Sequence, residues 1–208
     1  MRLWKHLRKG SKMKKIIFAT GNKDKMREIR EIMADMEVEI LSMKEAGIVV
    51  DVVEDGETFE ENALIKAKAI AEYTDAIVLA DDSGLEIDYL DKAPGVYSAR
   101  FMGEDTSYDI KNQALIDKLD GVPKEERTAR FVCAIAAVLP NKESLVVREA
   151  MEGYIGYEIA GENGFGYDPI FYLDEFGCSS AALSREQKNA ISHRGKALRA
   201  MKEILEKI

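Results

Sequence analysis

The sequence predicts an α/β fold in which an elongated mixed sheet is flanked by helices, with two lobes and a central cleft. In the first half of the chain, apolar runs typical of strands alternate with segments of helical period. In the second half, two long runs at 128–139 and 145–157 are typical of an antiparallel hairpin. A chain of 208 residues without an internal repeat or linker fits one two-lobed unit over residues 13–208 better than two independent domains.

The first half of the chain alternates predicted strands and helices. In order, we expect a strand at 14–20, a helix at 26–36, a strand at 38–41, an acidic loop at 47–57, a helix after Thr58 and a central strand at 76–80. Thr58 and Glu61 have the spacing of a capping box, in which two side chains satisfy the free N–H groups of a helix start. Asp81-Asp82-Ser83-Gly84 would lie at the carboxyl end of this central strand.

The second half contains the predicted hairpin and the last helix. In order, we expect a helix at 107–119, the hairpin strands at 128–139 and 145–157, a glycine-rich loop at 161–168, a short strand at 170–172 and a helix from Ser184 to Ile208. Ser184 with Gln187 repeats the capping-box spacing. A single last helix would bring Lys188, Ser192, His193 and Arg194 to one helical end.

Composition excludes several classes of protein. The hydrophobic content of 46% is too high for a disordered chain, and no apolar run approaches the ~18 residues that cross a bilayer. Two cysteines, Cys133 and Cys178, and two histidines exclude a disulfide framework and a cysteine- or histidine-rich zinc site. We therefore expect a reducing, cytoplasmic compartment and no membrane partner.

Charge is distributed unevenly between a basic leader and an acidic body. Residues 1–12 contain five Lys and Arg and no acid, whereas the rest has 25 Lys and Arg against 38 Asp and Glu, a formal charge of −13. An acidic body argues against a nucleic-acid polymer as partner, although a single nucleotide needs only a local pocket. The leader lacks the apolar stretch and cleavage site of a secretory signal, and we interpret it as an extension before Met13 with no role in the fold.

The first candidate site follows the first strand at Thr20-Gly21-Asn22-Lys23-Asp24-Lys25. Backbone N–H groups at a helix start bind phosphate, and a lysine there adds a positive charge. The segment matches neither the Walker A loop nor the dinucleotide fingerprint, and a capped turn with surface lysines explains its spacing equally well.

The second candidate site is Asp81-Asp82-Ser83-Gly84. Two carboxylates at the end of a buried strand repel each other and need a compensating charge, which Mg²⁺ supplies. The same four residues are good turn formers, but strand ends are where open α/β sheets bind ligands, which favours function.

Three further segments are weaker candidates. Glu54 could complete the metal site and Lys66 could reach a phosphate, although acidic residues before a helix usually serve its dipole. In the loop at 164–169, Phe165 offers a face for a base and Asp168 an acceptor for a ring N–H, or the loop is a turn with a buried aromatic. Lys188, His193 and Arg194 are interpreted as substrate contacts, although a lone histidine is more often structural.

Six segments in the same order resemble the inosine triphosphate pyrophosphatase family, also called the non-standard purine NTP pyrophosphatases or XTP/dITP diphosphatases. They are ATGNKDKMREI at 19–29, TFEENALIKA at 58–67, ADDSGL at 80–85, APGVYSAR at 93–100, GFGYDPIF at 164–171 and LSREQKNAISHRG at 183–195. Each motif alone is modest, but six in this order are highly specific, and the match runs from Met13 to the C-terminus.

This resemblance implies a homodimer that uses Mg²⁺ to hydrolyse ITP, dITP and XTP to the monophosphate and pyrophosphate. It implies that Glu54 and Asp82 hold the metal, that Asp82 accepts a proton and that Ser83 contacts substrate. The triphosphate loop would comprise Thr20, Gly21, Asn22, Lys23, Asp24 and Lys25. The base would be surrounded by Phe165, Gly166, Tyr167, Asp168, Lys188, His193 and Arg194.

Some alternatives stay open from sequence alone. Glu57 and Asp81 are also candidates for direct metal binding, and neither the dimer surface, the order of preference among the three nucleotides nor the rejection of guanine is visible. A non-catalytic nucleotide sensor that uses the same phosphate loop is the alternative function. The two adjacent carboxylates favour the enzyme, because a protein that only binds anions gains nothing from uncompensated acids beside them.

Overall fold

A computed structural model describes residues 14–207, so the predicted extension at 1–12 lies outside the described residues. The strands are β1 (Lys14–Phe18), β2 (Val38–Ser42), β3 (Ile77–Ile87), β4 (Thr128–Val138), β5 (Ser144–Ile155), β6 (Phe171–Leu173) and β7 (Cys178–Ser179). The α-helices are α1 (Lys23–Ile32), α2 (Phe59–Ala71), α3 (Tyr108–Lys118), α4 (Arg185–Ile191) and α5 (His193–Leu205).

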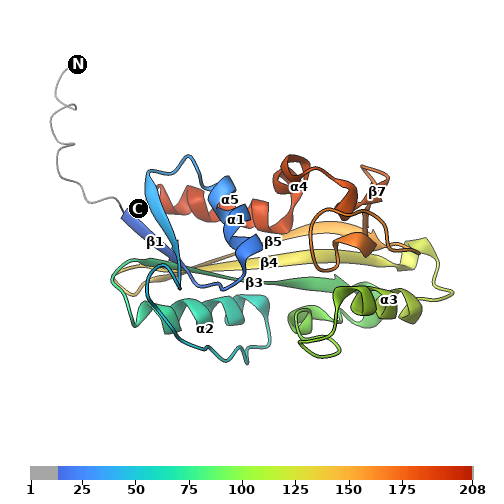
Figure 1. Ribbon diagram of the computed structural model, residues 1–208, viewed down its shortest axis with the longest axis horizontal. Helices are drawn as coiled ribbons and strands as arrows, with labels where there is room; N and C mark the ends of the chain where they lie inside the picture. Colours follow the sequence, from blue (N-terminus) through green and yellow to red (C-terminus); the bar gives the residue numbers. More distant parts are fainter. Residues whose placement is uncertain (1–13, 208) are drawn as a thin grey trace, which may run out of the picture.

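The strands form one mixed sheet in the order β2-β1-β3-β4-β5-β6-β7. β1 pairs in parallel with β2 and β3, and every later pairing is antiparallel. Helices α1, α4 and α5 lie on one side of the sheet and α2 and α3 on the other (Figure 1). The predicted fold class, a mixed sheet flanked by helices, is therefore confirmed.

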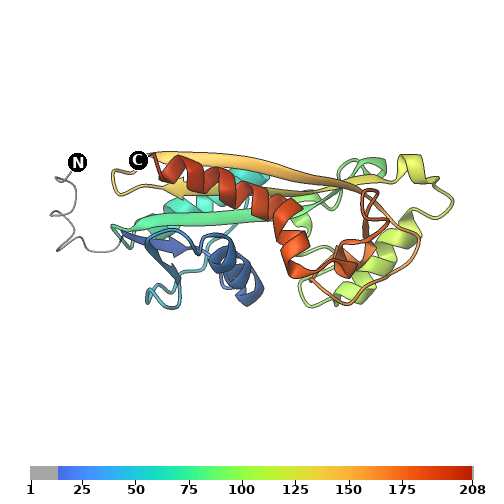
Figure 2. The same ribbon diagram turned by 90° about the horizontal axis from the view of Figure 1, so that it is seen from above.

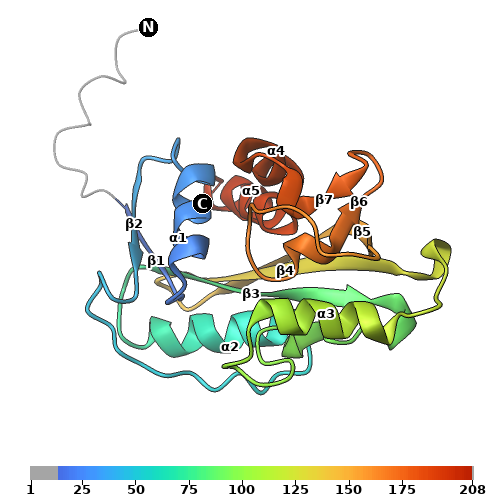
Figure 3. The same ribbon diagram turned by 45° about the vertical axis from the view of Figure 1, so that its right-hand side comes forward.

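The long strands form the axis along which the molecule is elongated. In Figure 2, α5 lies lengthwise over β4 and β5, and the contacts of α5 with both strands agree. Figure 3 shows α2 and α3 one after the other along the opposite side of the sheet. The predicted hairpin is confirmed as β4 and β5, which pair from Thr128 with Tyr154 to Val138 with Ser144.

Alternation along β3 sends successive side chains into different hydrophobic clusters. Leu79 packs with residues of α1 and α5, whereas Val78 and Ala80 pack with residues of α2. Successive side chains of a strand point to opposite faces of the sheet. A third cluster around α3, β6 and the far ends of β3 to β5 fills the other end of the molecule.

The two predicted capping boxes are present. Thr58 Oγ1 accepts from the backbone N–H of Glu61 at 3.1 Å, and the Glu61 carboxylate accepts from the N–H of Thr58 at 3.2 Å. A cap of this kind contributes about 1 kcal/mol to helix stability. Ser184 and Gln187 cap α4 in the same way.

Three predicted elements have wrong boundaries. The helix expected at 26–36 is α1, which spans Lys23–Ile32. The central strand does not end at Asp81: β3 continues to Ile87, because β4 pairs with it along its length, from Val78 with Val138 to Ile87 with Ala129. The last helix is also not continuous. Ser192 has extended backbone (φ −63°, ψ 150°) and its hydroxyl caps Gly195 N–H, so that it ends α4 and begins α5.

Candidate active site

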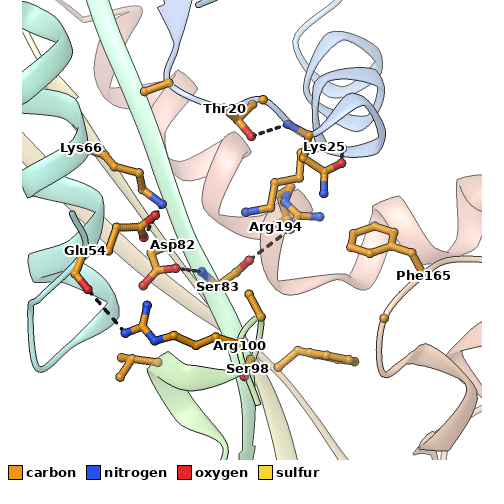
Figure 4. Close-up of a pocket in the computed structure, with 18 of the residues that line it drawn as sticks. Thr20, Lys25, Glu54, Lys66, Asp82, Ser83, Ser98, Arg100, Phe165 and Arg194 are labelled. Atoms are coloured by element: carbon orange, nitrogen blue, oxygen red, sulfur yellow. Dashed lines mark hydrogen bonds and ion pairs between the residues drawn. The ribbon is translucent and has the colours of Figure 1, made fainter. Parts of the chain in front are cut away.

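A cavity of about 500 Å³ lies over β3, beyond the point where β1 stops pairing with it. It is lined from the loop before α1, the segment before α2, the middle of β3, the turn at 96–100, the loop at 165–168 and the start of α5. Figure 4 shows Lys25, Asp82, Arg100 and Arg194 converging on this space. Segments far apart in the sequence therefore meet at one cleft.

The loop before α1 is fastened by its own side chains. Asn22 Oδ1 accepts from the N–H groups of Asp24 and Lys25 at 2.8 and 3.2 Å, and Thr20 Oγ1 accepts from Asn22 N–H at 3.2 Å. Two of the N–H groups at this helix start are therefore already satisfied within the protein. Lys25 also lines the cavity, so its ammonium group can approach an anion at this loop.

Asp81 pairs with two cations, the half-buried Lys25 and the buried Arg194, on the side of the sheet that α1 and α5 cover. Its Oδ2 lies 2.9 Å from Lys25 Nζ and 3.5 Å from Arg194 Nε. Arg194 also pairs with Glu28 and donates to Ser83 Oγ at 3.2 Å. Burial alone would raise the pKa of Asp81, but Lys25 and then Arg194 hold it well below its usual range. Asp81 is therefore an ionised counter-ion.

Asp82 faces the other way, toward the start of α2. Its Oδ2 accepts from Asn62 Nδ2 at 3.1 Å and its Oδ1 from Ser83 N–H at 2.9 Å. Burial raises the pKa of Asp82; Lys66 opposes this effect and the nearby Glu54 carboxylate adds to it. Glu54 in turn pairs with Lys66, with Oε2 2.7 Å from Nζ.

Phe165 forms an aromatic wall at the opposite end of the cavity. Lys188 Nζ lies 4.9 Å and the Arg194 guanidinium 5.6 Å from the centre of its ring. The loop that holds Phe165 is tied by Asp168, which accepts from Phe165 N–H at 2.8 Å and pairs with Lys188 at 2.6 Å. Gly164 permits this tie, because its φ is +77° and a Cβ there would lie 2.3 Å from Asp168 Oδ2.

His193 lines the same end and is held uncharged. Its ring stacks on Phe131, with centroids 5.0 Å apart and planes 15° from parallel. Burial, followed by the charges of Arg194 and Lys188, lowers the pKa of His193 well below its usual range. Its Nδ1 is buried and has no hydrogen-bond partner within the described residues. A neutral imidazole in this position can form one hydrogen bond with a ligand through Nδ1.

Most of the residues predicted from sequence line this one cavity. Those that line it are Thr20, Gly21, Asn22, Lys25, Glu54, Lys66, Asp82, Ser83, Phe165, Gly166, Tyr167, Asp168, Lys188, His193 and Arg194. Lys23 and Asp24 do not: Lys23 is exposed and borders a neighbouring depression, and Asp24 pairs with Arg27.

Sequence reasoning missed several lining residues. Ser98, Arg100 and Tyr108 come from the turn and helix between β3 and β4. The motif ending in Arg100 was available in the sequence, but its distance of 18 positions from Asp82 gave no indication that the chain folds back there. Asp168 differs from expectation in another way, since Phe165, Lys188 and Ser180 already donate to its two oxygens.

The donor set of the cavity fits a hard divalent cation. Residues 14–207 contain no group of three or more His, Cys, Asp and Glu side chains arranged to hold a metal. Mg²⁺, however, is commonly held by one or two carboxylates together with substrate phosphates and water. Asp82 and Glu54 meet this requirement, because both line the cavity and a cation would compensate the burial and the Glu54 charge that raise the pKa of Asp82.

None of the described helices is both long enough and apolar enough to cross a membrane.

The comparisons with known proteins agree with the resemblance found in the motifs. Residues 16–204 match the sequence profile of the Ham1 family. A relative from Clostridium perfringens, named dITP/XTP pyrophosphatase, is 46% identical over 202 residues, covering 94% of this chain and 99% of its own. The solved structure of a HAM1 protein from Coxiella burnetii has a TM-score of 0.86 at 39% identity, covering 94% of this chain and 100% of its own. The Ham1 protein of Staphylococcus aureus has a TM-score of 0.84 at 40% identity, covering 93% and 98%. The chain belongs to the Ham1 family, and the resemblance read from its six motifs is confirmed.

Proposed function

We propose that this protein hydrolyses the non-standard purine nucleotides ITP, dITP and XTP to their monophosphates and pyrophosphate, and so cleanses the nucleotide pool. The observation that supports this most strongly is a single cavity that combines an aromatic wall, several cations and a half-buried carboxylate with a raised pKa. A nucleoside triphosphate has the matching base, polyphosphate charge and scissile phosphoanhydride. The names of the family relatives agree with this substrate class.

The triphosphate would lie between the loop before α1 and the start of α2. Lys25 and Lys66 both line the cavity there, and both already face carboxylates, Asp81 and Glu54. Their charges would neutralise the phosphates and the pyrophosphate that leaves. Thr20 and Asn22 would shape the loop, and Lys23 would contribute only through long-range charge, because it is outside the cavity.

Asp82 and Glu54 are the residues that we propose to hold Mg²⁺. The two alternatives left open by the sequence are less suitable: Asp81 is committed to Lys25 and Arg194, and Glu57 is exposed and does not line the cavity. When bound, Mg²⁺ would supply charge neutralisation to the phosphate oxygens and help to orient them. Lys66 would then leave the Glu54 carboxylate and turn to a phosphate.

Asp82 is also our candidate for positioning and deprotonating the attacking water. The attack on the α-phosphorus needs an acceptor for one water proton, and the Asp82 carboxylate, which lines the cavity, can accept it. The hydrogen bond from Asn62 Nδ2 fixes the orientation of the Asp82 carboxylate. The proton remains on Asp82 until the products leave and solvent takes it up.

The base would stack on Phe165 with Lys188, His193 and Arg194 around its edge. ITP and XTP have a carbonyl at C6, where ATP has an amino group, so a cluster of donors favours the former. Arg194 reaches this end while Glu28, Asp81 and Ser83 hold its guanidinium in place. Asp168 and Gly166 would act through the shape of the loop, since the carboxylate of Asp168 is already occupied.

The remaining parts of the proposal concern the whole protein. We propose one two-lobed unit over residues 13–208, a homodimer and a cytoplasmic location, in line with the family resemblance and with a substrate drawn from the nucleotide pool. Light scattering after size-exclusion chromatography would test the homodimer, which predicts twice the 23.3 kDa mass of one chain.

A nucleotide panel tests the function directly. The protein is mixed with Mg²⁺ and dITP, XTP, ITP, dGTP or ATP, and both phosphate products are identified. We expect pyrophosphate from the first three and far slower reaction of ATP. Orthophosphate as the sole inorganic product would overturn the proposal, and nucleotide-induced thermal stabilisation without turnover would favour the sensor instead.

A further inference from the structure

Arg100 differs from the other cations of the cavity in having no carboxylate partner. Lys25, Lys66, Lys188 and Arg194 also line the cavity, and each forms an ion pair with an acidic residue of the protein. Within residues 14–207, Arg100 forms none. The other four charges are therefore already compensated, and that of Arg100 is not.

The backbone next to Arg100 is held firmly against the rest of the fold. Ser98 Oγ accepts from Leu85 N–H at 2.8 Å and donates to the Gly95 carbonyl at 2.6 Å, which fastens the turn to β3. The carbonyl of Ala99 accepts from the buried Lys111 Nζ at 2.8 Å. This close packing needs a glycine on β3, because a Cβ at Gly84 would lie 2.4 Å from Ser98 Oγ. The fold therefore fixes the base of the Arg100 side chain.

The Arg100 guanidinium itself is exposed and only lightly held. It stacks on Tyr97, 4.8 Å from the ring centre, and donates to the backbone carbonyl of Glu54 at 3.4 Å, close to the limit of a hydrogen bond. Figure 4 shows the side chain running along the cavity below Asp82 and Ser83, toward Glu54. Its charge thus lies at the end of the cavity proposed to hold the metal and far from Phe165.

We propose that Arg100 binds the phosphates of the substrate from the side opposite Lys25 and stabilises the pyrophosphate that leaves. This inference rests on the proposed function and adds a residue to it. The guanidinium offers several N–H donors in a fixed fork, which match phosphate oxygens far better than a single carbonyl. A triphosphate therefore replaces the weak contact of Arg100 with the Glu54 carbonyl. The charge of Arg100 becomes paired only when substrate is bound.

The test compares Arg100→Ala, Arg100→Lys and the control Arg185→Ala. Arg185 is an exposed arginine on α4 that pairs with Glu31 outside the cavity, so this control removes the same charge elsewhere. The measurements are kcat and KM for dITP and for ATP, and the affinity for inorganic tripolyphosphate by calorimetry. Losing a charge-assisted hydrogen bond to phosphate lowers kcat/KM and tripolyphosphate affinity by roughly 10- to 100-fold. Arg100→Lys keeps the charge without the fork and should fall between, and Arg185→Ala should match the wild type.

The ratio of kcat/KM for dITP to that for ATP separates phosphate binding from base reading. A phosphate contact predicts equal losses for both nucleotides, so a loss confined to dITP would overturn the inference, as would an Arg100→Ala variant within twofold of the wild type in both assays. Melting curves of the three variants should coincide, because Arg100 is exposed; a fall in melting temperature that Arg100→Lys does not restore would indicate a structural role instead. A wild type that hydrolyses none of the nucleotides would refute the proposed function. The role of Arg100 in phosphate binding would still be tested, because tripolyphosphate binding is measured without turnover.

Discussion

Asp81 and Asp82 are neighbours on β3, yet their side chains lie on opposite faces of the sheet and their pKa values are shifted in opposite directions. Asp81 is 1% exposed and faces α1 and α5, where Lys25 and Arg194 hold its pKa below the usual range. Asp82 is half-buried and faces the start of α2, where burial and the charge of Glu54 keep its pKa above the usual range.

The difference shows that strand geometry, rather than residue type, divides the work between the two carboxylates. Because successive side chains of a strand point to opposite faces, the two carboxylates have different surroundings. Asp82 lines the cavity beyond the end of β1, whereas Asp81 is buried behind Lys25 and Arg194. Asp81 organises the cations on one wall. On the other wall, Asp82 is the proton acceptor that we propose for the reaction. The two roles can be separated experimentally, because one should affect stability and the other turnover.

The largest expected effect is that of Asp82→Asn on turnover. We expect pyrophosphate release from dITP to fall roughly 10³-fold, because the amide does not accept the water proton and binds a cation more weakly than a carboxylate does. The melting temperature should change little, since the substitution removes a half-buried charge beside Glu54 rather than a needed partner. A variant that retains a tenth of the wild-type rate would contradict the assignment of Asp82.

Asp81→Asn should reverse this pattern. The substitution leaves Lys25 and Arg194 without their shared counter-ion in a buried site, which costs about 3 kcal/mol of the free energy of unfolding. For a chain of this size we expect the melting temperature to fall by roughly 6–12 °C. Asp174→Asn is the matched control, because Asp174 pairs with Lys124 on the exposed surface. Equal melting temperatures for the two variants would show that Asp81 is not a structural counter-ion.

The family, the fold class and most cavity residues were predictable because they depend on short-range patterns. Ordered motifs, the capping boxes at Thr58 and Ser184, and the hairpin of β4 and β5 are all local features of the sequence. Each of these features can be recognised from the sequence without knowledge of tertiary contacts.

The errors arose where tertiary contacts override local chemistry. Asp81 to Gly84 form a good turn sequence, but pairing with β4 and compensation by distant cations keep them in a strand. The break at Ser192 likewise reflects a cap that only the folded chain forms. Arg100 was missed because the motif does not show that this side chain lines the cavity without a carboxylate partner among residues 14–207.

Lowering the pH should protonate Asp82 before Asp81. In metal-free protein, Asp82 should take up its proton above the ordinary value of 3.8 and Asp81 only below it. Asp81 therefore contributes stability that is fully present above pH 3.8 and is lost as the pH falls toward the lowered pKa of Asp81. Asp82 acts with the opposite sign, because the folded state with its raised pKa binds a proton more readily than the unfolded chain. Carboxyl NMR titrations of the wild type and the two Asn variants would show the order, and coincident titration of both groups would refute it.

Ser83→Ala should give the smallest effect and refine the division between the faces. Ser83 is two residues from Asp81 and shares its face of β3, and its Oγ accepts from Arg194 Nη2 at 3.2 Å. Because Glu28 and Asp81 still hold Arg194, we expect only about a threefold rise in KM for dITP, with kcat and melting temperature nearly unchanged. A fall in kcat comparable to that of Asp82→Asn would place the chemistry on the Asp81 side of the strand, and the division of labour proposed for the two carboxylates would have to be reversed.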